Sequence, residues 1–336
     1  CRYANQVAEG KDLTEQEAME AMDIIMSGGA TNAQIAALLT ALRMKGETIA
    51  EITGFAKGMR AKANHVTGCE ESVDIVGTGG DLASSFNIST TSSFVIAAAG
   101  MPVAKHGNRS VSSKSGAADV LESLGVKIQT TPEQAKASIE HVGISFLFAQ
   151  SYHGSMKYVG PARKEMGMRT VFNILGPLTN PASTNYIVLG VYEKALLPVM
   201  AHVLIGLGIK NAMIVYGNDR LDEISISDST SVAEVRDGVV TEYEIAPEDF
   251  GLPRGTKEDI VGGTADENAG ITRGILNGSI QGAKRNIVLL NAGCALYITG
   301  KAETIADGVA LAAQQIDSGK ALEKLHELIA FTNGEA

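Results

Sequence analysis

Cysteine is scarce in this chain of 336 residues, where Cys1, Cys69 and Cys294 are the only three. They form neither a CxxC pair nor a spacing typical of metal ligands. An odd number of separate thiols is typical of proteins in a reducing compartment. We therefore interpret them as core or surface thiols and expect a cytoplasmic protein.

Positive charge is also in short supply, with 28 Lys and Arg residues against 38 Asp and Glu residues and a net charge of −10. A general polyanion-binding surface needs a surplus of basic residues, so we expect no nucleic-acid partner. Any phosphate site must be a local basic region within an acidic chain.

Long hydrophobic runs are missing as well. The longest weakly charged stretches, 82–104 and 195–209, are unsuitable as membrane spans: the first is rich in Ser and Thr, and the second is short and contains His202. With 45% hydrophobic and 20% charged residues, the composition is that of an ordinary globular protein. The length favours two domains over one.

The first seventy residues predict a small helical unit. Three threonines each precede an acid or amide by three positions, which is the capping-box signature of a helix start. Gly28 and Gly46 stand where helices should end. The three pairs are Thr14 with Glu17, Thr31 with Gln34, and Thr48 with Glu51.

From Ser72 onward, short apolar runs bounded by glycine alternate with helix-like segments, which indicates parallel strands joined by crossover helices. Asp237-Gly238 lies between two further apolar runs and predicts a tight antiparallel hairpin. The expected fold class is α/β, a small all-helical domain plus a larger domain with a mainly parallel central sheet and antiparallel additions. Parallel strands are expected at 73–76, 103–104, 144–149, 186–191 and 213–216.

A glycine-rich segment, 74–81, follows the first expected strand and is itself followed by Asn87-Ile-Ser-Thr90 at a helix start. Glycines allow close approach of a ligand, and exposed amides at a helix N-terminus favour an anion. The spacing matches neither GxGxxG nor the P-loop. The segment is either a phosphate site or a purely structural turn.

The segment 105–115 carries Lys105, Arg109 and Lys114, with no acid before Asp119. It is rich in serine and begins at another expected strand end, where open α/β sheets usually bind ligands. We interpret it as a loop that surrounds an anionic ligand. A solvated basic loop is the alternative.

Two other groups are candidate ligands. Asp222-Glu223 offers oxygen atoms that suit Mg²⁺ near a polyphosphate, although exposed acid pairs are common. Arg163 and Arg169 could each bind a carboxylate through the planar guanidinium, or could instead pair with acids such as Glu165. No Ser-His-Asp or Cys-His order indicates a nucleophile.

Taken in order, these segments resemble the anthranilate phosphoribosyltransferase family over nearly the whole chain. The most specific parts are the stretch 105–121 and the tract Arg169-Thr-Val-Phe-Asn-Ile-Leu-Gly-Pro-Leu-Thr-Asn-Pro181. The resemblance implies transfer of the phosphoribosyl group from 5-phosphoribosyl 1-pyrophosphate (PRPP) to the amine of anthranilate, the second step of tryptophan biosynthesis from chorismate.

The resemblance also implies an organisation and an assembly. The helical domain covers 1–70 and is completed by roughly 163–183, while 72–162 and 184–336 form the PRPP-binding α/β domain. A homodimer through the helical domains is implied, and an association with anthranilate synthase is left open. No membrane partner is expected.

The resemblance assigns residues by position. Two Mg²⁺ ions would be held by Ser89, Asp222 and Glu223, and anthranilate would contact Gly77, His106, Asn108 and Arg163. The residues implied for PRPP are Gly77, Thr78, Gly79, Gly80, Asp81, Ser85, Asn87, Ile88, Ser89, Thr90, Lys105, His106, Gly107, Asn108, Arg109, Ser110, Val111, Ser112, Ser113 and Ala117.

The implied chemistry agrees with the absence of a nucleophile motif. Loss of pyrophosphate from C1 of the ribose builds positive charge on the sugar and negative charge on the leaving group, so charge neutralisation matters more than a covalent nucleophile. Two other functions remain as alternatives: a pyrimidine nucleoside phosphorylase-like enzyme, against which Arg163 with Asn108 argues, and a non-catalytic nucleic-acid-binding relative, which would need a basic face.

Overall fold

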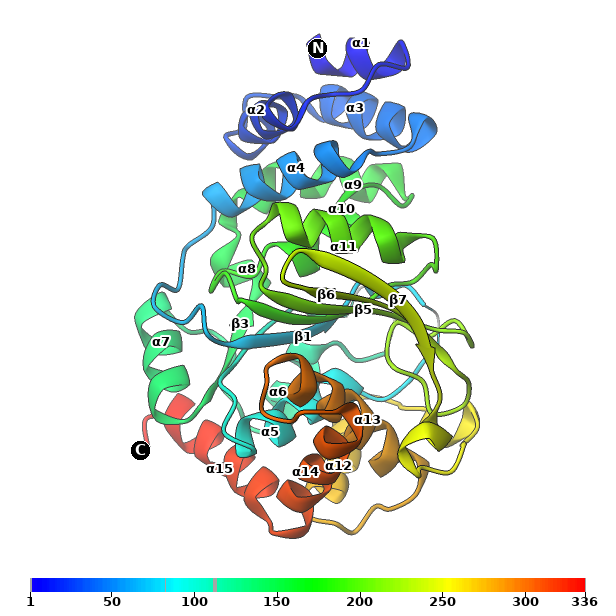
Figure 1. Ribbon diagram of the computed structural model, residues 1–336. Coiled ribbons are helices and arrows are strands. Elements are labelled where there is room, and N and C mark those ends of the chain that lie inside the picture. Colours follow the sequence, from blue (N-terminus) through cyan, green and yellow to red (C-terminus); the bar gives the residue numbers. More distant parts are fainter. Residues whose placement is uncertain (1, 82, 111–113, 336) are drawn as a thin grey trace.

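The computed structural model describes residues 2–81, 83–110 and 114–335, so Val111, Ser112 and Ser113 of the expected PRPP loop lie outside the described residues. The first helices form one end of the molecule, at the top of Figure 1, together with the N-terminus. Their bounds are α1 (Arg2–Ala8), α2 (Glu15–Met26), α3 (Asn32–Lys45) and α4 (Ile49–Ala61).

Threonine capping boxes open α2, α3 and α4, as the sequence predicts. In α2, for example, the Thr14 hydroxyl accepts from the Glu17 amide at 3.1 Å, and the Glu17 carboxylate accepts from the Thr14 amide at 2.9 Å. Each such cap stabilises its helix by about 1 kcal/mol. Gly46 ends α3 at a φ of 88°, which an L side chain rarely adopts.

The central sheet has seven strands in the order β3-β2-β1-β4-β5-β6-β7. The first five strands in that order are parallel, and β6 and β7 are antiparallel additions. This confirms the predicted fold class and the hairpin at Asp237-Gly238. The bounds are β1 (Val73–Gly77), β2 (Val103–Gly107), β3 (Ile144–Phe148), β4 (Tyr186–Gly190), β5 (Asn211–Gly217), β6 (Thr230–Arg236) and β7 (Val239–Ile245).

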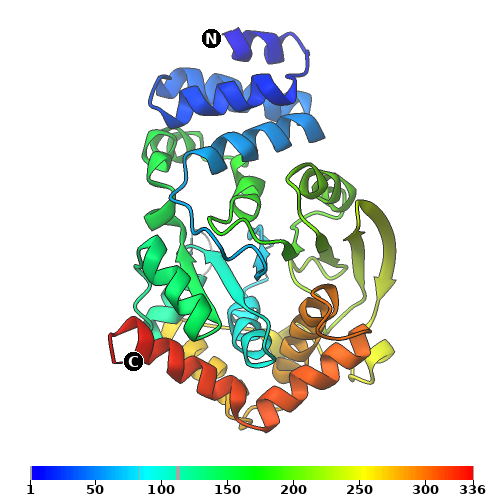
Figure 2. The ribbon, with the colours of Figure 1, turned by 60° about the vertical axis from the view of Figure 1, so that its left-hand side comes forward.

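Both faces of the sheet are covered (Figure 2). One face packs on the helices from α5 and α12 to α15, and the C-terminus lies at that end of the molecule. The bounds on this side are α5 (Ile88–Ala98), α6 (Ala117–Ser123), η3 (Pro247–Phe250), η4 (Glu258–Ile260), α12 (Ala265–Leu276), α13 (Ala283–Ile298), α14 (Ile305–Asp317) and α15 (Lys320–Thr332).

The other face packs on α11 and the helical end of the molecule. α9 contacts α3, and α10 contacts α4, so the segment between β3 and β4 joins the N-terminal helices to the sheet. The bounds here are α7 (Pro132–His141), α8 (Ala149–Tyr152), η1 (Gly154–Tyr158), α9 (Gly160–Met166), α10 (Phe172–Leu175), η2 (Gly176–Leu178) and α11 (Leu196–Gly206).

Successive side chains of a strand point to opposite faces, and this alternation separates Asp74 and His106 from the core residues of the same strands. Asp74 lies between Val73 and Ile75 on β1, and His106 alternates with Val103 and Lys105 on β2. Val73, Ile75 and Val103 belong to the core on the α5 side. Asp74 and His106 therefore face the helical end. Within the described residues, no helix is long and apolar enough to cross a membrane.

Candidate active site

The candidate site lies where the strand order reverses. From β1 the chain proceeds to β2 and β3 on one side, and it later returns to β4 and β5 on the other. Ligands of open α/β sheets bind outside the carboxyl ends of the strands at such a point. Gly77 and Gly190 are paired there, as the last residues of β1 and β4.

The glycines at these strand ends make room for the acidic loop. A Cβ atom added to Gly77 would overlap Oδ2 of Asp222, and one added to Gly190 would overlap the Asp222 backbone oxygen. The Gly79 amide donates to Asp222 Oδ2 at 2.7 Å. Gly79 and Gly80 have φ values of 71° and 77°, in the left-handed region that favours glycine. The glycine cluster therefore has a structural role as well as a geometry suited to anions.

The acid pair is held between two buried residues of the loop. Leu221 and Ile224 are 1% and 0% exposed, while Asp222 and Glu223 between them are half-buried. The Asp222 amide donates to Asp81 Oδ2 at 3.3 Å, so three carboxylates gather at the strand ends. The sequence predicts the pair, and the structure adds Asp81 as its neighbour.

This crowding affects the acidity of the carboxyl groups. Burial raises the pKa of Asp222 well above its usual range, and the nearby charges of Asp81 and Glu223 raise it further. Burial raises the pKa of Glu223 to about 8, against the opposing effect of Lys105. Crowded carboxylates that resist ionisation are stabilised by a divalent cation.

These oxygen donors fit magnesium. Mg²⁺ in phosphate sites is usually held by one or two carboxylates together with water and phosphate oxygens. Among the described residues, no group of three or more His, Cys, Asp and Glu side chains is arranged to hold a metal ion by themselves. Asp222 and Glu223 offer oxygen ligands of this kind.

Lys105 places a buried ammonium group next to these carboxylates. The side chain is 3% exposed, and Nζ donates to the Ile75 carbonyl at 2.6 Å and to Ser89 Oγ at 3.1 Å. Asp74, Glu223 and Asp222 are the negative charges that act on it. The ammonium group thus lies beside both the acid pair and the start of α5.

The start of α5 combines core and site residues. Ile88 and Thr90 are 0% and 2% exposed, whereas Ser89 is half-buried and its backbone amide donates to Glu223. Asn87 is fixed by neighbours, since its Oδ1 accepts from Asn268 Nδ2 at 2.9 Å. Of the residues implied for PRPP in this segment, Ser89 is the one in contact with both Lys105 and the acid pair.

The loop after β2 is less open than the sequence indicates. The Arg109 guanidinium forms ion pairs with Asp119 at 3.0 Å and with Glu122 at 2.6 Å, and the Ser110 amide also donates to Asp119. Gly107 lies at the end of β2, Asn108 is exposed, and Ala117 begins α6. In this structure the charge of Arg109 is balanced by acids from α6.

Two other residues implied for PRPP, Thr78 and Ser85, contact the backbone of neighbouring segments. Thr78 Oγ1 accepts from the Tyr192 amide at 3.1 Å, and the Thr78 amide donates to the Gly190 carbonyl. Ser85 forms an isolated bridge with Val261. Of the two, Thr78 lies at the strand ends, where the diphosphate is expected.

Two histidines face the segment 176–181, which connects α10 to β4. His106 Nδ1 lies 3.2 Å from the Gly176 carbonyl, and His153 Nε2 lies 3.0 Å from the Thr179 carbonyl. A carbonyl oxygen only accepts, so each of these nitrogens carries the proton. His106 Nε2 is then an acceptor; it is buried and has no partner among the described residues.

The same segment is held by residues that the sequence analysis leaves unassigned. Asn180 Nδ2 donates to Asp74 Oδ2 and to the Ala104 carbonyl, both at 2.8 Å. Arg60 Nε of α4 donates to the Leu178 carbonyl at 2.7 Å. A buried acid inside a predicted strand, Asp74, is the one signal that could have indicated this network. Its partner Asn180 lies 106 positions away in the sequence.

The two candidate arginines have different surroundings. Arg163, in the last turn of α9, lies over the Phe172 ring with 5.3 Å between Cζ and the ring centroid. Arg169 lies 4.1 Å from the Tyr192 ring centroid and donates to the Gly80 carbonyl. Within the described residues neither forms an ion pair, so the predicted alternative of pairing with Glu165 does not occur there.

The comparisons with known proteins identify the family. Residues 2–63 match "Glycosyl transferase family, helical bundle domain", and residues 69–322 match "Glycosyl transferase family, a/b domain". The anthranilate phosphoribosyltransferase of Methanobrevibacter smithii is 57% identical over 327 residues, which cover 97% of each chain. The chain belongs to the anthranilate phosphoribosyltransferase family.

Solved structures of this family have the same fold. The anthranilate phosphoribosyltransferase of Thermus thermophilus superposes with a TM-score of 0.94 at 40% identity, covering 99% of this chain and 100% of that chain. The anthranilate phosphoribosyltransferase of Saccharomyces cerevisiae, solved in complex with PRPP and Mg, superposes with a TM-score of 0.91 at 27% identity, with coverage of 99% and 97%. The family predicted from the sequence is confirmed.

The buried histidine pair leads to a prediction about stability and pH. Burial, helped by His153, lowers the pKa of His106 to about 3, and burial lowers that of His153 to about 4. These folded pKa values lie below the unfolded value of 6.5. At a pH between the folded and unfolded pKa values, the unfolded chain therefore binds more protons than the folded chain. Stability should therefore fall as pH decreases from 7 to 5.

Thermal unfolding of His106→Asn with His153→Gln tests this, since each amide nitrogen can replace the donating ring nitrogen without titrating. The double variant is expected to lose less of its unfolding midpoint between pH 7 and 5 than the parent. Burial raises the pKa of Asp74 to about 6, which acts in the opposite direction but is present in both proteins. An unchanged pH slope would contradict the assignment.

Proposed function

We infer that this chain transfers the phosphoribosyl group of PRPP to the amine of anthranilate, with release of pyrophosphate and in dependence on Mg²⁺. The observation that carries this inference is the acid pair Asp222-Glu223, held against the glycine ends of β1 and β4 beside the buried Lys105. The reaction is the one that the relatives above are named for, and the S. cerevisiae enzyme was solved in complex with PRPP and Mg.

The diphosphate would bind at the carboxyl ends of the strands. The glycine loop 77–80 allows close approach of the ligand, although the Thr78 and Gly79 amides donate to Gly190 and Asp222, and α5 adds the positive end of its dipole and the Ser89 hydroxyl. Lys105 supplies one positive charge close to these groups. When the diphosphate leaves, its negative charge increases, and donors that are already fixed in place stabilise that change without reorganisation.

Magnesium would supply the remaining positive charge on the leaving group. We propose that Asp222, Glu223 and Ser89 hold two Mg²⁺ ions. This proposal is supported by the raised pKa values of the two carboxyls and by the contact of Glu223 with the Ser89 amide. Carboxylates that share an ion with the diphosphate would anchor the leaving group at the strand ends.

Anthranilate would be bound on the other face of the strand ends. The guanidinium of Arg163, which has no ion-pair partner in the described part of the chain, and the exposed amide of Asn108 would hold the ring carboxylate. Gly77 allows close approach. His106 Nε2, for which the described residues supply no partner, would accept a hydrogen bond from the amine. The nitrogen lone pair would then be free to attack C1 as the bond to pyrophosphate breaks.

The reaction is tested by incubating the chain with PRPP, Mg²⁺ and anthranilate and following the loss of anthranilate fluorescence. Phosphorolysis of pyrimidine nucleosides is assayed beside it. We expect anthranilate consumption that requires both PRPP and Mg²⁺. Nucleoside phosphorolysis without anthranilate consumption would contradict the proposed function.

We also propose that two copies associate through the helical domain, taken as 1–70 completed by roughly 163–183. A groove of about 690 Å³ lies between α1 and α3 and is lined largely by small residues such as Ala33, Ala36, Ala37 and Gly10. Met44 at its border is 84% exposed, and large exposed apolar side chains often mark interfaces. A second copy would cover this surface.

Met44→Glu should therefore shift the protein from dimer to monomer, because a charged side chain would be buried at the interface. Light scattering coupled to size-exclusion chromatography measures the change. Val239→Glu is the matched control, since Val239 is 63% exposed on β7, away from the groove. The proposal fails if Met44→Glu leaves the mass unchanged, or if the control dissociates equally.

A further inference from the structure

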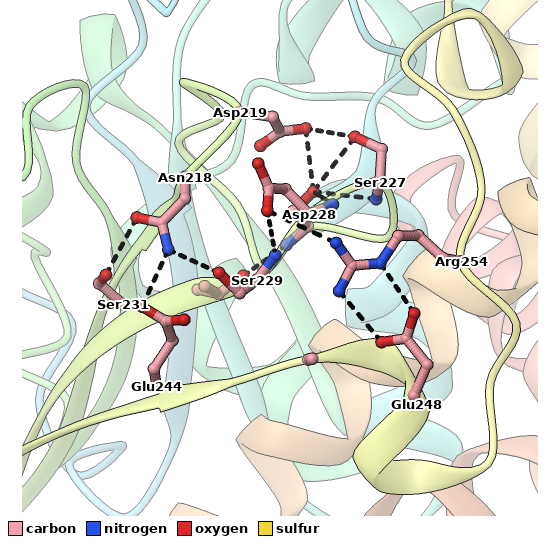
Figure 3. A network of polar contacts seen from close by, with 12 residues as sticks. Asn218, Asp219, Ser227, Asp228, Ser229, Ser231, Glu244, Glu248 and Arg254 are labelled. Atoms are coloured by element: carbon pink, nitrogen blue, oxygen red, sulfur yellow. Dashed lines mark hydrogen bonds and ion pairs between the residues drawn. The ribbon is translucent and has the colours of Figure 1, made fainter.

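The acid pair is carried by the loop 218–229 between β5 and β6, and one side of this loop is fixed by its own residues. Asp219 Oδ2 accepts from Ser225 Oγ at 2.9 Å and from Ser227 Oγ at 2.5 Å (Figure 3). Asn218 donates to Ser229 Oγ at 2.8 Å. Asn218 also contacts Ser231 of β6 and Glu244 of β7, and none of these contacts involves Glu223.

A side chain from α13 also holds the loop, at the residue next to Glu223. The Ile224 amide donates to Asn291 Oδ1 at 3.0 Å, and Asn291 Nδ2 donates to the Ile224 carbonyl at 2.9 Å. Asn291 Nδ2 also donates to the Ile287 carbonyl of its own helix at 2.9 Å. Asn291 therefore satisfies both backbone groups of the residue that follows Glu223.

Asn291 lies where a side-chain amide without hydrogen-bond partners would destabilise the fold. Asn291 and Ile224 are both 0% exposed, and Ile287, Leu290 and Cys294 around Asn291 on α13 belong to the apolar core. A polar group buried at such a site is unfavourable unless its hydrogen bonds are made. Two of the three hydrogen bonds that this amide forms within the described residues go to Ile224, directly beside the acids.

We propose that Asn291 is a positioning residue for the acid pair: by holding the Ile224 backbone, its amide fixes the carboxylates of Asp222 and Glu223 at the glycine ends of β1 and β4. The inference rests on the proposed metal role of these carboxylates. α13 packs against β4 and β5 and also holds the loop through Asn291. One helix therefore sets the position of the loop relative to the strand ends. Asn291 itself touches neither metal nor substrate.

Metal binding tests the proposal without relying on turnover. The full chain is titrated with Mn²⁺ in the presence of pyrophosphate, and free Mn²⁺ is measured by electron paramagnetic resonance. Asn291→Leu and Asn291→Ser are both expected to weaken Mn²⁺ binding about 10-fold or more, the usual effect of removing a group that orients a ligand. Ser keeps a polar group but cannot reach both backbone atoms, and it serves if the Leu variant does not fold.

Val288→Ala is the matched control, because Val288 is buried on the same helix and its truncation lowers stability without removing a bond to the loop. We expect it to bind Mn²⁺ within about two-fold of the parent. The positioning role is overturned if Asn291→Ser also binds within two-fold, or if Val288→Ala weakens binding as much at a similar loss of stability.

A fourth protein separates this inference from the proposed function. Asp222→Asn with Glu223→Gln should abolish the Mn²⁺ binding that depends on pyrophosphate and the acid pair. If that double variant binds normally, the metal role is wrong and the inference falls with it. If it loses binding while Asn291→Ser does not, the metal role stands and only the positioning role of Asn291 is rejected.

Discussion

Replacement of Arg163 by alanine is expected to lower kcat/KM for anthranilate by about one to two powers of ten, while kcat/KM for PRPP changes much less. The guanidinium has no acidic partner among the described residues, so its removal leaves no carboxylate unpaired in the protein. The loss reflects a hydrogen bond to a charged group, worth ~1.5–3 kcal/mol.

Steady-state kinetics with each substrate varied in turn measures this effect. Arg163→Lys keeps the charge but loses the planar two-point geometry, so it should fall between the parent and the alanine variant. Arg169→Ala provides a comparison, because that guanidinium is occupied by the Gly80 carbonyl and the Tyr192 ring. Equal losses for both substrates in Arg163→Ala would show that the assignment is wrong.

The double variant Asp222→Asn with Glu223→Gln should lose activity about 100-fold or more at the Mg²⁺ concentration that saturates the parent, since even groups that only orient a metal ligand contribute 10- to 100-fold. Added Mg²⁺ should restore part of the loss. The result follows from the position of both side chains at the strand ends, with Asp222 accepting from the Gly79 amide.

The same variant has an opposite expected effect on stability. A raised folded pKa means that ionisation of Asp222 and Glu223 destabilises the protein as pH rises toward 8, so neutral amides should raise the unfolding midpoint at pH 8 without Mg²⁺. Asp237→Asn with Glu242→Gln removes the same charge from the exposed hairpin and controls for net charge. Activity indifferent to Mg²⁺ in both parent and variant would reject the metal role.

Local patterns in the sequence predict much of the fold. The capping boxes, the glycine-bounded strands and the hairpin at Asp237-Gly238 depend on residues within a few positions of one another, and each is present in the structure. The glycine loop and the acid pair follow strands that the sequence also predicts. Parallel topology then brings them to one edge of the sheet.

The remaining parts of the site depend on contacts between distant segments. Asp74 pairs with Asn180 across 106 positions, and Asn291 holds Ile224 across 67. No periodicity links such residues, and one sequence contains no covariation from which to infer them. At Arg109 the sequence predicts a charge available to a ligand, whereas in the structure the acids of α6 form ion pairs with it.

A crystal structure of this chain with PRPP, Mg²⁺ and anthranilate would test the central claim most directly. We expect the diphosphate beside the 77–80 loop and the start of α5, magnesium between it and the carboxylates of Asp222 and Glu223, and the anthranilate carboxylate on Arg163. A diphosphate bound elsewhere, or carboxylates remote from any metal ion, would contradict the account.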